Sequence, residues 1–354
     1  MTSDDIQAEL IHSVELAIKD NRPISIHGSG SKTFLGNSSV GKPMNVSHHK
    51  GIIDYEPSEL FITARCGTSL HEIESTLRNN DQILPFEPPC YASTDTIGGT
   101  IACGLSGPRR AYSNSIRDCI LGTHIINGKA EYLVFGGSVM KNVAGYDASR
   151  LMCGAFGTLG IITQASLRVS PKPQHEMTTV LEYSQSEAIT QLNQWTQSHL
   201  PISASFFHNN QLFIRLEGLE NSVVKSMNTI GGETLSSSEE FWQSIKNHHH
   251  DFFKSELPLW KCVVPRNTPP LPIAGQTCVE WSGGLRWLIS DESPEVITKT
   301  CIQAKGSATL FSAKIKPNEF LPDLPPSLKK LHRNIKVAFD PDNILNPGRQ
   351  YSWC

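Results

Sequence analysis

The uneven distribution of glycine most constrains what this chain can fold into. Residues 1–160 contain 18 of the 26 glycines, whereas the longer remainder of the chain contains eight. Glycine permits backbone conformations and close approaches that other residues forbid. We therefore expect the first half to be built around tight loops, followed by a part of different construction.

A proline-rich step marks the boundary between these parts. Residues 171–173 read Pro-Lys-Pro after a strand-like segment, and proline cannot continue the hydrogen-bond ladder of a sheet. A chain of 354 residues is also longer than one ordinary domain needs, which indicates two lobes or one elaborated domain. We expect a first domain over residues 1–172, a second lobe over residues 173–315 and a C-terminal helix and tail over residues 316–354.

Hydrophobic periodicity predicts a mixed α+β fold. In the first part it predicts helices over residues 4–19 and 69–77, strands over residues 23–27 and 60–64, and extended structure over residues 82–84. In the second lobe we expect strands near 177–183, 203–208, 211–217, 260–265, 277–281, 285–289 and 307–311, and helices near 184–198, 219–229, 238–254 and 293–304. A final helix is predicted near 327–338.

Composition excludes several classes of function. The 31 basic and 34 acidic residues give a formal charge of −3, so no general affinity for nucleic acid or anionic lipid is expected. The nine cysteines form no C-x-x-C pair, which argues against an iron–sulfur or zinc site, and we expect no metal. The N-terminus has no signal-peptide pattern, and the longest uncharged stretch, residues 188–214, is rich in Gln, Asn and Ser. We therefore expect a cytoplasmic protein with free thiols and no membrane-spanning helix.

The first glycine cluster follows the strand predicted over residues 23–27. It reads His-Gly-Ser-Gly-Ser-Lys from His27, and a loop without bulky side chains lets successive amides turn toward one anion. The cluster lacks the spacing of a nucleotide P-loop or of a Rossmann turn. An ordinary tight turn explains this cluster equally well.

The second cluster contains Thr-Ile-Gly-Gly-Thr from Thr96 and ends in Ser-Gly-Pro-Arg-Arg at Arg110. The start of a helix at this point presents amides to a phosphate, and its glycines allow close contact. The alternative is a tightly packed helix crossing, which explains Gly98, Gly99 and Ala102 but not the Ser-Gly-Pro-Arg-Arg that follows. We favour ligand binding.

The third cluster places Gly154, Gly157 and Gly160 immediately before an apolar strand. This spacing lays the main chain flat against a large planar ligand. Lys141, Tyr146 and Arg150 lie nearby in the sequence, and their alternative role is surface solvation or an ion pair with Asp147.

In this order, the three clusters resemble the FAD-binding domain of the vanillyl-alcohol oxidase, or PCMH, type. The segments TIGGTIACGLSGPRR, VMKNVAGYDASRLMCGAFGTLGIIT and AFDPDNILNPGR resemble more specifically the FAD-binding second subunits of bacterial glycolate oxidases. The resemblance implies a two-part FAD-binding domain with an inserted α+β cap lobe. It also implies that FAD contacts Gly28, Ser29, Gly30, Ser31, Thr96, Gly98, Gly99, Gly104, Gly154, Gly157, Thr158, Gly160 and Ile162.

Two departures from this superfamily affect the chemistry. Relatives with covalent flavin carry a histidine just after the first glycine loop, where this chain has Ser31, so the resemblance implies noncovalent FAD. Related hydroxy-acid dehydrogenases carry a His-rich metal motif with Gly-Asp-Gly-Asn in the cap, and this sequence has none. The run His248-His249-His250 is no substitute, because consecutive helical residues point about 100° apart. We interpret this run as a solvated helix end.

Two classes of function follow from the resemblance, and no catalytic residue is assigned in either. In one, the chain itself oxidises a 2-hydroxy acid on FAD. In the other, which the missing metal motif favours, it is an accessory electron-transfer subunit of a glycolate-oxidising complex with a catalytic flavoprotein and an iron–sulfur subunit. Such partners imply peripheral association with the inner membrane. An assembly scaffold without FAD is a third, less favoured interpretation because the glycine loops are intact.

Overall fold

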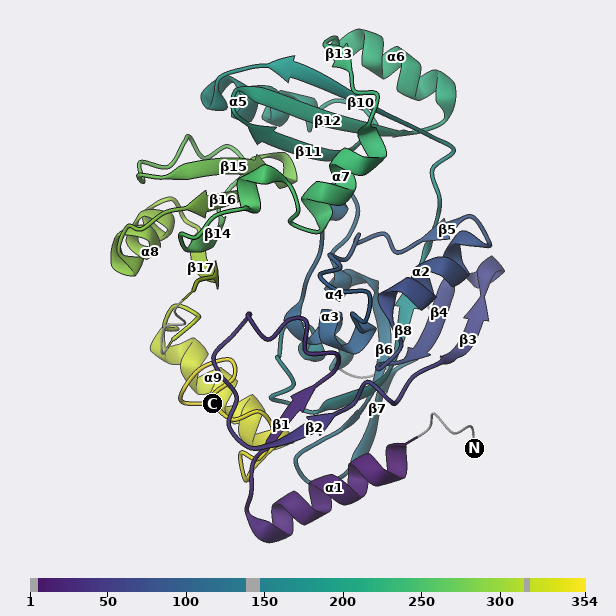
Figure 1. Cartoon of the computed structure of the whole chain (residues 1–354), viewed down its shortest axis with the longest axis vertical. Coiled ribbons are helices and arrows are strands. Elements are labelled where there is room, and N and C mark those ends of the chain that lie inside the picture. The colour runs from purple at the N-terminus through teal and green to yellow at the C-terminus, as the bar shows by residue number, and fades with distance from the viewer. Residues whose placement is uncertain (1–5, 138–146, 315–318) are drawn as a thin grey trace. The chain divides into compact units, whose positions relative to one another are not determined.

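The computed structural model describes residues 6–137, 147–314 and 319–354 (Figure 1). These residues form two compact units. Unit 1 comprises residues 1–105, 115–171 and 317–354, and unit 2 comprises residues 106–114 and 172–316. Among the described residues, no helix combines the length and the apolar character needed to cross a bilayer.

Unit 1 contains a five-stranded antiparallel sheet in the order β3-β4-β8-β6-β7. Its strands are β3 (Ile52–Glu56), β4 (Phe61–Arg65), β6 (Ile120–Ile126), β7 (Tyr132–Gly136) and β8 (Ile161–Arg168). Two smaller sheets pair β1 (Ile24–His27) with β2 (Lys42–Asn45) and β5 (Gln82–Ile83) with β9 (Ser170–Pro171). The helices are α1 (Gln7–Asp20), α2 (Leu70–Arg78), α3 (Ile97–Cys103), α4 (Ile116–Cys119) and α9 (Pro326–Phe339), with short 3-10 turns η1 (Pro57–Glu59) and η3 (Ser149–Met152).

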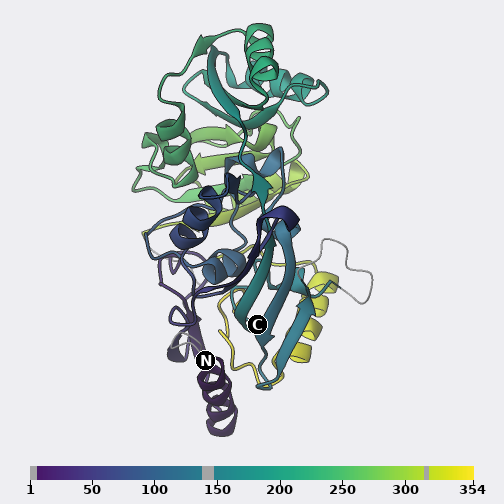
Figure 2. The ribbon, with the colours of Figure 1, turned by 90° about the vertical axis from the view of Figure 1, so that its right-hand side faces the viewer.

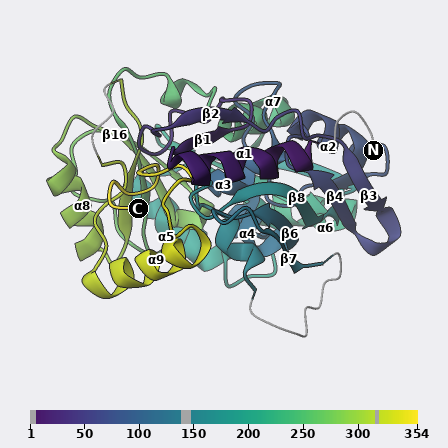
Figure 3. The same cartoon turned by 90° about the horizontal axis from the view of Figure 1, so that it is seen from below.

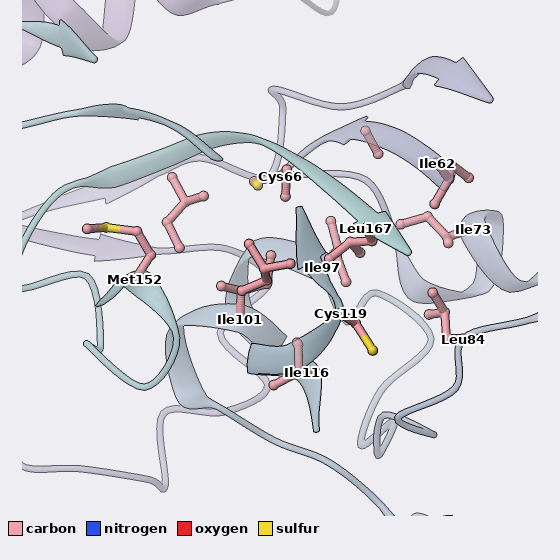
Figure 4. Close-up of a cluster of buried hydrophobic side chains, with 14 of the residues drawn as sticks. Ile62, Cys66, Ile73, Leu84, Ile97, Ile101, Ile116, Cys119, Met152 and Leu167 are labelled. Atoms are coloured by element: carbon pink, nitrogen blue, oxygen red, sulfur yellow. The ribbon is translucent and has the colours of Figure 1, made fainter. Parts of the chain in front are cut away.

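The main core of unit 1 lies between this sheet and α2, α3 and α4. Figure 4 shows Ile97 and Ile101 of α3 pointing into the same cluster as Ile73 of α2 and Leu167 of β8, all almost fully buried. The helix α9, yellow in Figure 2, lies beside the sheet, and Phe339 contacts Phe135 of β7 with ring centroids 6.1 Å apart. This core fixes the start of α3 relative to the sheet.

A second core in unit 1 brings the two ends of the chain together. Leu10 and Val14 of α1 pack with Ile24 of β1 and with Ile344 and Leu345 of the C-terminal tail. Figure 3 shows α1 beside β1 and β2. The C-terminal segment thus belongs to unit 1, although more than 140 residues of unit 2 separate it from the rest in sequence.

Unit 2 contains an eight-stranded sheet in the order β13-β10-β12-β11-β15-β16-β14-β17. Its strands are β10 (His175–Glu182), β11 (Ile202–His208), β12 (Gln211–Gly218), β13 (Glu233–Thr234), β14 (Leu259–Val263), β15 (Gln276–Glu280), β16 (Leu285–Ile289) and β17 (Ser307–Ser312). Its helices are α5 (Gln185–Trp195), α6 (Glu220–Ile230), α7 (Ser238–Lys246) and α8 (Pro294–Gln303), with 3-10 turns η2 (Pro108–Ala111), η4 (Asp251–Phe253) and η5 (Trp281–Gly283). Every strand and helix predicted in this lobe is present in the predicted order, and the structure adds the short strand β13, which was not predicted.

Residues 106–114 differ from the sequence prediction, which placed them in the first domain. They cluster with unit 2 because their side chains bond to its sheet. Arg109 forms a bidentate ion pair with Glu217, and the Tyr112 hydroxyl donates to Ser205 Oγ at 2.8 Å. The boundary proposed at residue 172 therefore leaves out one segment of the second unit.

The helix predicted over residues 238–254 is too long, and the interpretation of the histidine run as a solvated helix end is wrong for His248, although His249 is exposed. The helix α7 ends at Lys246, and His248 has a left-handed φ of 57°. Its ring stacks on the ring of Phe253 with centroids 4.2 Å apart, and it contacts the ring of Trp287 with centroids 4.9 Å apart. Burial among these aromatic rings lowers the pKa of His248 to about 3, so it is a neutral packing residue.

Candidate functional site

Unit 1 contains an open pocket of about 700 Å³, part of which is open solvent. Its wall combines the loop after β1, the start of α3, the loop before β8 and the C-terminal tail. Ten of the thirteen residues that the resemblance assigns to FAD line this pocket: Gly28, Ser29, Gly30, Ser31, Thr96, Gly98, Gly99, Gly157, Gly160 and Ile162. The sequence segments that resemble an FAD-binding domain thus meet at one place.

The loop after β1 supplies the hydrogen-bond donors of the pocket. Within the described part of the chain, the backbone amides of Gly28, Ser29, Gly30 and Ser31 donate no hydrogen bond. Gly30 has a φ of 81°, which a side chain rarely tolerates, and open space lies around it. Consecutive amides without a protein acceptor form a concave site suited to a phosphate group.

The start of α3 does not supply free amides, contrary to the sequence prediction. The Ile97 amide donates to Thr68 O at 3.0 Å, and the Gly98 amide donates to Cys66 O at 2.9 Å. The Gly99 amide donates to the N-cap hydroxyl of Thr96 at 3.2 Å. Because protein acceptors satisfy these three amides, α3 shapes the pocket wall and the loop after β1 provides the donors.

The adjacent glycines of α3 have different roles. A Cβ on Gly98 would lie 2.7 Å from both Cβ and O of Cys66, so Gly98 is required by packing inside the protein. A Cβ on Gly99 would meet only Thr96 Oγ1, at 3.2 Å. The tightly packed helix crossing therefore explains Gly98, whereas the absence of a side chain at Gly99 keeps the pocket open.

Lys32 and Asp95 form a buried ion pair at the pocket, which the sequence analysis missed. Lys32 Nζ lies 2.8 Å from Asp95 Oδ2, and the two side chains are 6% and 0% exposed. The same carboxylate oxygen accepts the Tyr91 amide at 2.8 Å. Lys32 lines the pocket next to the free amides, and Asp95 balances its charge there. A lysine directly after the Gly-Ser-Gly-Ser loop was the available signal.

The C-terminal tail contributes two further pocket residues, Asn346 and Arg349. Asn346 Oδ1 accepts the amide of Ile26 at 2.6 Å, and its Nδ2 donates to Phe156 O at 2.7 Å. It thereby joins β1 to the loop before β8. The Arg349 guanidinium donates to the carbonyls of Asn37 and Lys32, which places a second cation on the wall.

Three predicted contact residues are not among those that line the pocket. Gly104 ends α3 in a left-handed conformation, and a Cβ there would lie 3.3 Å from Gly154 Cα. The Thr158 hydroxyl donates to Ala155 O at 2.7 Å. These residues shape loops that support the wall, and contact of Gly104, Gly154 and Thr158 with FAD stays a prediction.

The polar residues near the third cluster have a structural explanation where they are described. Arg150 Nε lies 2.9 Å from Asp147 Oδ2, and both side chains are partly exposed. This is the ion pair weighed as the alternative role. Lys141 and Tyr146 lie outside the described residues.

Comparisons with known proteins agree with this site. Residues 6–149 match the family of FAD binding domains. The chain is 42% identical over 348 residues to glycolate oxidase subunit GlcE of Escherichia coli, covering 98% of both chains. It is 29% identical over 171 residues to glycolate oxidase subunit GlcD of Bacillus subtilis, which is 48% of this chain and 36% of that protein.

A solved structure of alkyldihydroxyacetonephosphate synthase shares the fold. It superposes with a TM-score of 0.69 at 16% identity, covering 96% of this chain and 75% of the other. The expected fold, an α+β chain with a PCMH-type FAD-binding domain, is confirmed.

Proposed function

This chain belongs to the family of glycolate oxidase subunit GlcE, and on that premise we propose that it is an FAD-binding subunit of a complex that oxidises glycolate to glyoxylate. The observation that carries the proposal is the sequence identity of 42%, which extends over 98% of both chains. The pocket supports it, because the residues present fit the cofactor. The free amides from Gly28 to Ser31 would hold the pyrophosphate, and Arg349, whose guanidinium bonds only to backbone carbonyls among the described residues, would offset part of its charge.

FAD, when bound, supplies the capacity to accept and pass on two electrons. The chain's own residues hold and orient it. Asn346 ties β1 to the loop before β8, and Gly99 leaves room for close approach. We propose an accessory electron-transfer role beside a catalytic flavoprotein and an iron–sulfur subunit, in the cytoplasm or at the inner membrane through those partners. A self-contained 2-hydroxy-acid oxidoreductase is the second candidate.

Anaerobic addition of glycolate separates these two roles. We expect the chain purified alone to be yellow and to keep its flavin absorbance when glycolate is added. A colourless chain that takes up no FAD would instead support an assembly scaffold, and bleaching by glycolate would establish the self-contained enzyme.

We also predict a stable complex in native cells. Purification through a tag on this chain is expected to recover a second flavoprotein and an iron–sulfur protein. Glycolate-dependent dye reduction should be high in that preparation and absent from the isolated chain. Full dye reduction by the isolated chain would reject the complex.

FAD is predicted to be held noncovalently. Ser31 occupies the position of the linking histidine, and its hydroxyl lies 3.1 Å from Ser29 Oγ. The other nucleophilic side chains on the described wall include His27 and Cys103. Burial raises the pKa of the Cys103 thiol to about 11, which keeps it protonated and poorly nucleophilic. Acid precipitation should release the flavin into the supernatant, and flavin in the pellet would contradict this prediction.

A further inference from the structure

The two faces of the unit 2 sheet differ in chemistry. On one face, Leu212, Ile214 and Leu216 of β12 share an aliphatic cluster with α5 and α6. The alternate residues of the same strand include Arg215 and Glu217, which are buried and charged. Burying a charged side chain costs free energy unless the charge is paired. Each buried charge on this face is therefore expected to have a partner.

Most cations on this polar face have such a partner. Arg109 pairs with Glu217, and Arg215 Nε lies 3.2 Å from Glu217 Oε1 and donates to Ser203 Oγ at 2.9 Å. Lys261 of β14 is different. Its ammonium forms no hydrogen bond and no ion pair with any residue that the structure describes.

Two cations, Lys261 and Arg110, lie near the indole ring of Trp281. Lys261 Nζ is 5.0 Å from the centroid of the Trp281 ring, and Arg110 Cζ is 4.4 Å from it. Two cations near one ring repel each other, although each gains from the ring's electrons. Glu280 is the neighbouring carboxylate, and its Oε1 accepts a hydrogen bond from Trp287 Nε1 at 2.6 Å.

The backbone at this point is strained. Trp281 and Ser282 are consecutive, buried, and left-handed, with φ of 52° and 56°. Contacts hold them there: Trp281 Nε1 donates to Gly107 O at 3.1 Å, and the Ser282 amide donates to Ser205 Oγ at 3.1 Å. Ser282 Oγ is fully buried and has no hydrogen-bond partner among the described residues. Strain of this kind is concentrated at ligand sites.

We propose that Lys261 and Arg110 bind the carboxylate of a small organic acid against the Trp281 indole. A carboxylate supplies the acceptors that Lys261 lacks, and its negative charge is attracted by both cations. Arg110 is exposed and Lys261 is half-buried, so neither side chain is fully closed off from solvent. The identification of this acid as a 2-hydroxy acid or its 2-oxo product rests on the proposed function.

Calorimetric titration of the full chain with glycolate tests the site without any redox reaction. We expect saturable binding that Lys261→Met weakens at least about tenfold, because charge-assisted hydrogen bonds are lost. Lys225→Met, on the exposed surface of α6 in the same unit, is the matched control and should bind as the unaltered chain does. Arg110→Gln, at an exposed position, should also weaken binding, which guards against a folding defect at Lys261.

The pH dependence is a second readout. Burial and the nearby Arg110 charge lower the pKa of Lys261 to about 8, while Glu280 opposes them. His248, which also faces Lys261, has a pKa of about 3 and stays neutral. Lys261 therefore loses its charge as the pH rises through about 8, and glycolate affinity should fall over that range in the unaltered chain but not in Lys261→Met.

Three outcomes would overturn the site: no saturable glycolate binding, binding unchanged by Lys261→Met, or inorganic phosphate binding more tightly than glycolate. None of these outcomes affects FAD uptake or recovery of the complex. The proposed function is therefore tested independently of this site. Binding of glycolate without flavin bleaching supports both the carboxylate site and the accessory role.

Discussion

Replacing Gly99 with valine is expected to weaken FAD binding about thirty- to thousandfold with little change in stability. A Cβ at this position meets only Thr96 Oγ1, at 3.2 Å, a close contact that a shift of this hydroxyl by a few tenths of an ångström would relieve. The two methyl groups of valine would fill space in the pocket. FAD is expected to approach the backbone of α3 at this point. A loss of about 2–4 kcal/mol of binding free energy corresponds to this range of affinity.

The measurement is an absorbance or fluorescence titration of the FAD-free chain, with thermal unfolding recorded in parallel. The neighbouring glycine provides a contrasting variant. In Gly98→Val the new Cβ would collide with the backbone of Cys66 at 2.7 Å, so that variant should lose stability first. If Gly99→Val binds FAD as tightly as the unaltered chain, the start of α3 does not contact the cofactor.

The local parts of this site were predictable from sequence because their signals are local. The N-cap of α2 is one example, since Ser69 Oγ accepts the Glu72 amide at 3.1 Å as the capping pattern requires. The loop from Gly28 to Ser31 is another, since a strand that ends in alternating glycine and serine has few conformations open to it. The conformation of both segments is determined by a few neighbouring residues.

What the sequence could not reveal depends on contacts between distant segments. Nothing near Thr96 indicates that the amides of Gly98 and Ile97 are taken by carbonyls of residues 66 and 68. Asn346 bonds to Ile26 across 320 residues of sequence. Such pairings are set by how the sheet and the tail pack, and a single sequence carries no record of that packing.

The second large effect that we expect concerns the residues that hold the C-terminal tail in unit 1. Lys336 of α9 is buried and donates from Nζ to three acceptors: Asp340 Oδ2 at 2.6 Å, Thr158 O at 2.8 Å and Leu345 O at 2.9 Å. Asp340 in turn accepts the amides of Ile344 and Leu345. This network joins α9, the loop before β8 and the tail that carries Asn346.

Lys336→Met should lower the free energy of unfolding by about 3–5 kcal/mol, because it leaves Asp340 charged and buried without its cation. Urea unfolding of the FAD-free chain measures the loss. Lys329→Met is the control in the same helix. Its ion pair with Asp323 is partly exposed, with the two side chains 27% and 73% exposed, so this variant should change stability by less than about 1 kcal/mol.

The double variant Lys336→Met with Asp340→Asn tests whether the effect comes from the unpaired charge. Its loss should be smaller than the sum of the two single losses, since the neutral amide no longer needs a cation. FAD affinity should fall in Lys336→Met as well, because Asn346 and Arg349 reach the pocket wall only when the tail is held against β1. A Lys336→Met chain that is as stable as Lys329→Met, yet binds FAD normally, would show that the tail is held by its apolar contacts with α1 and β1 alone.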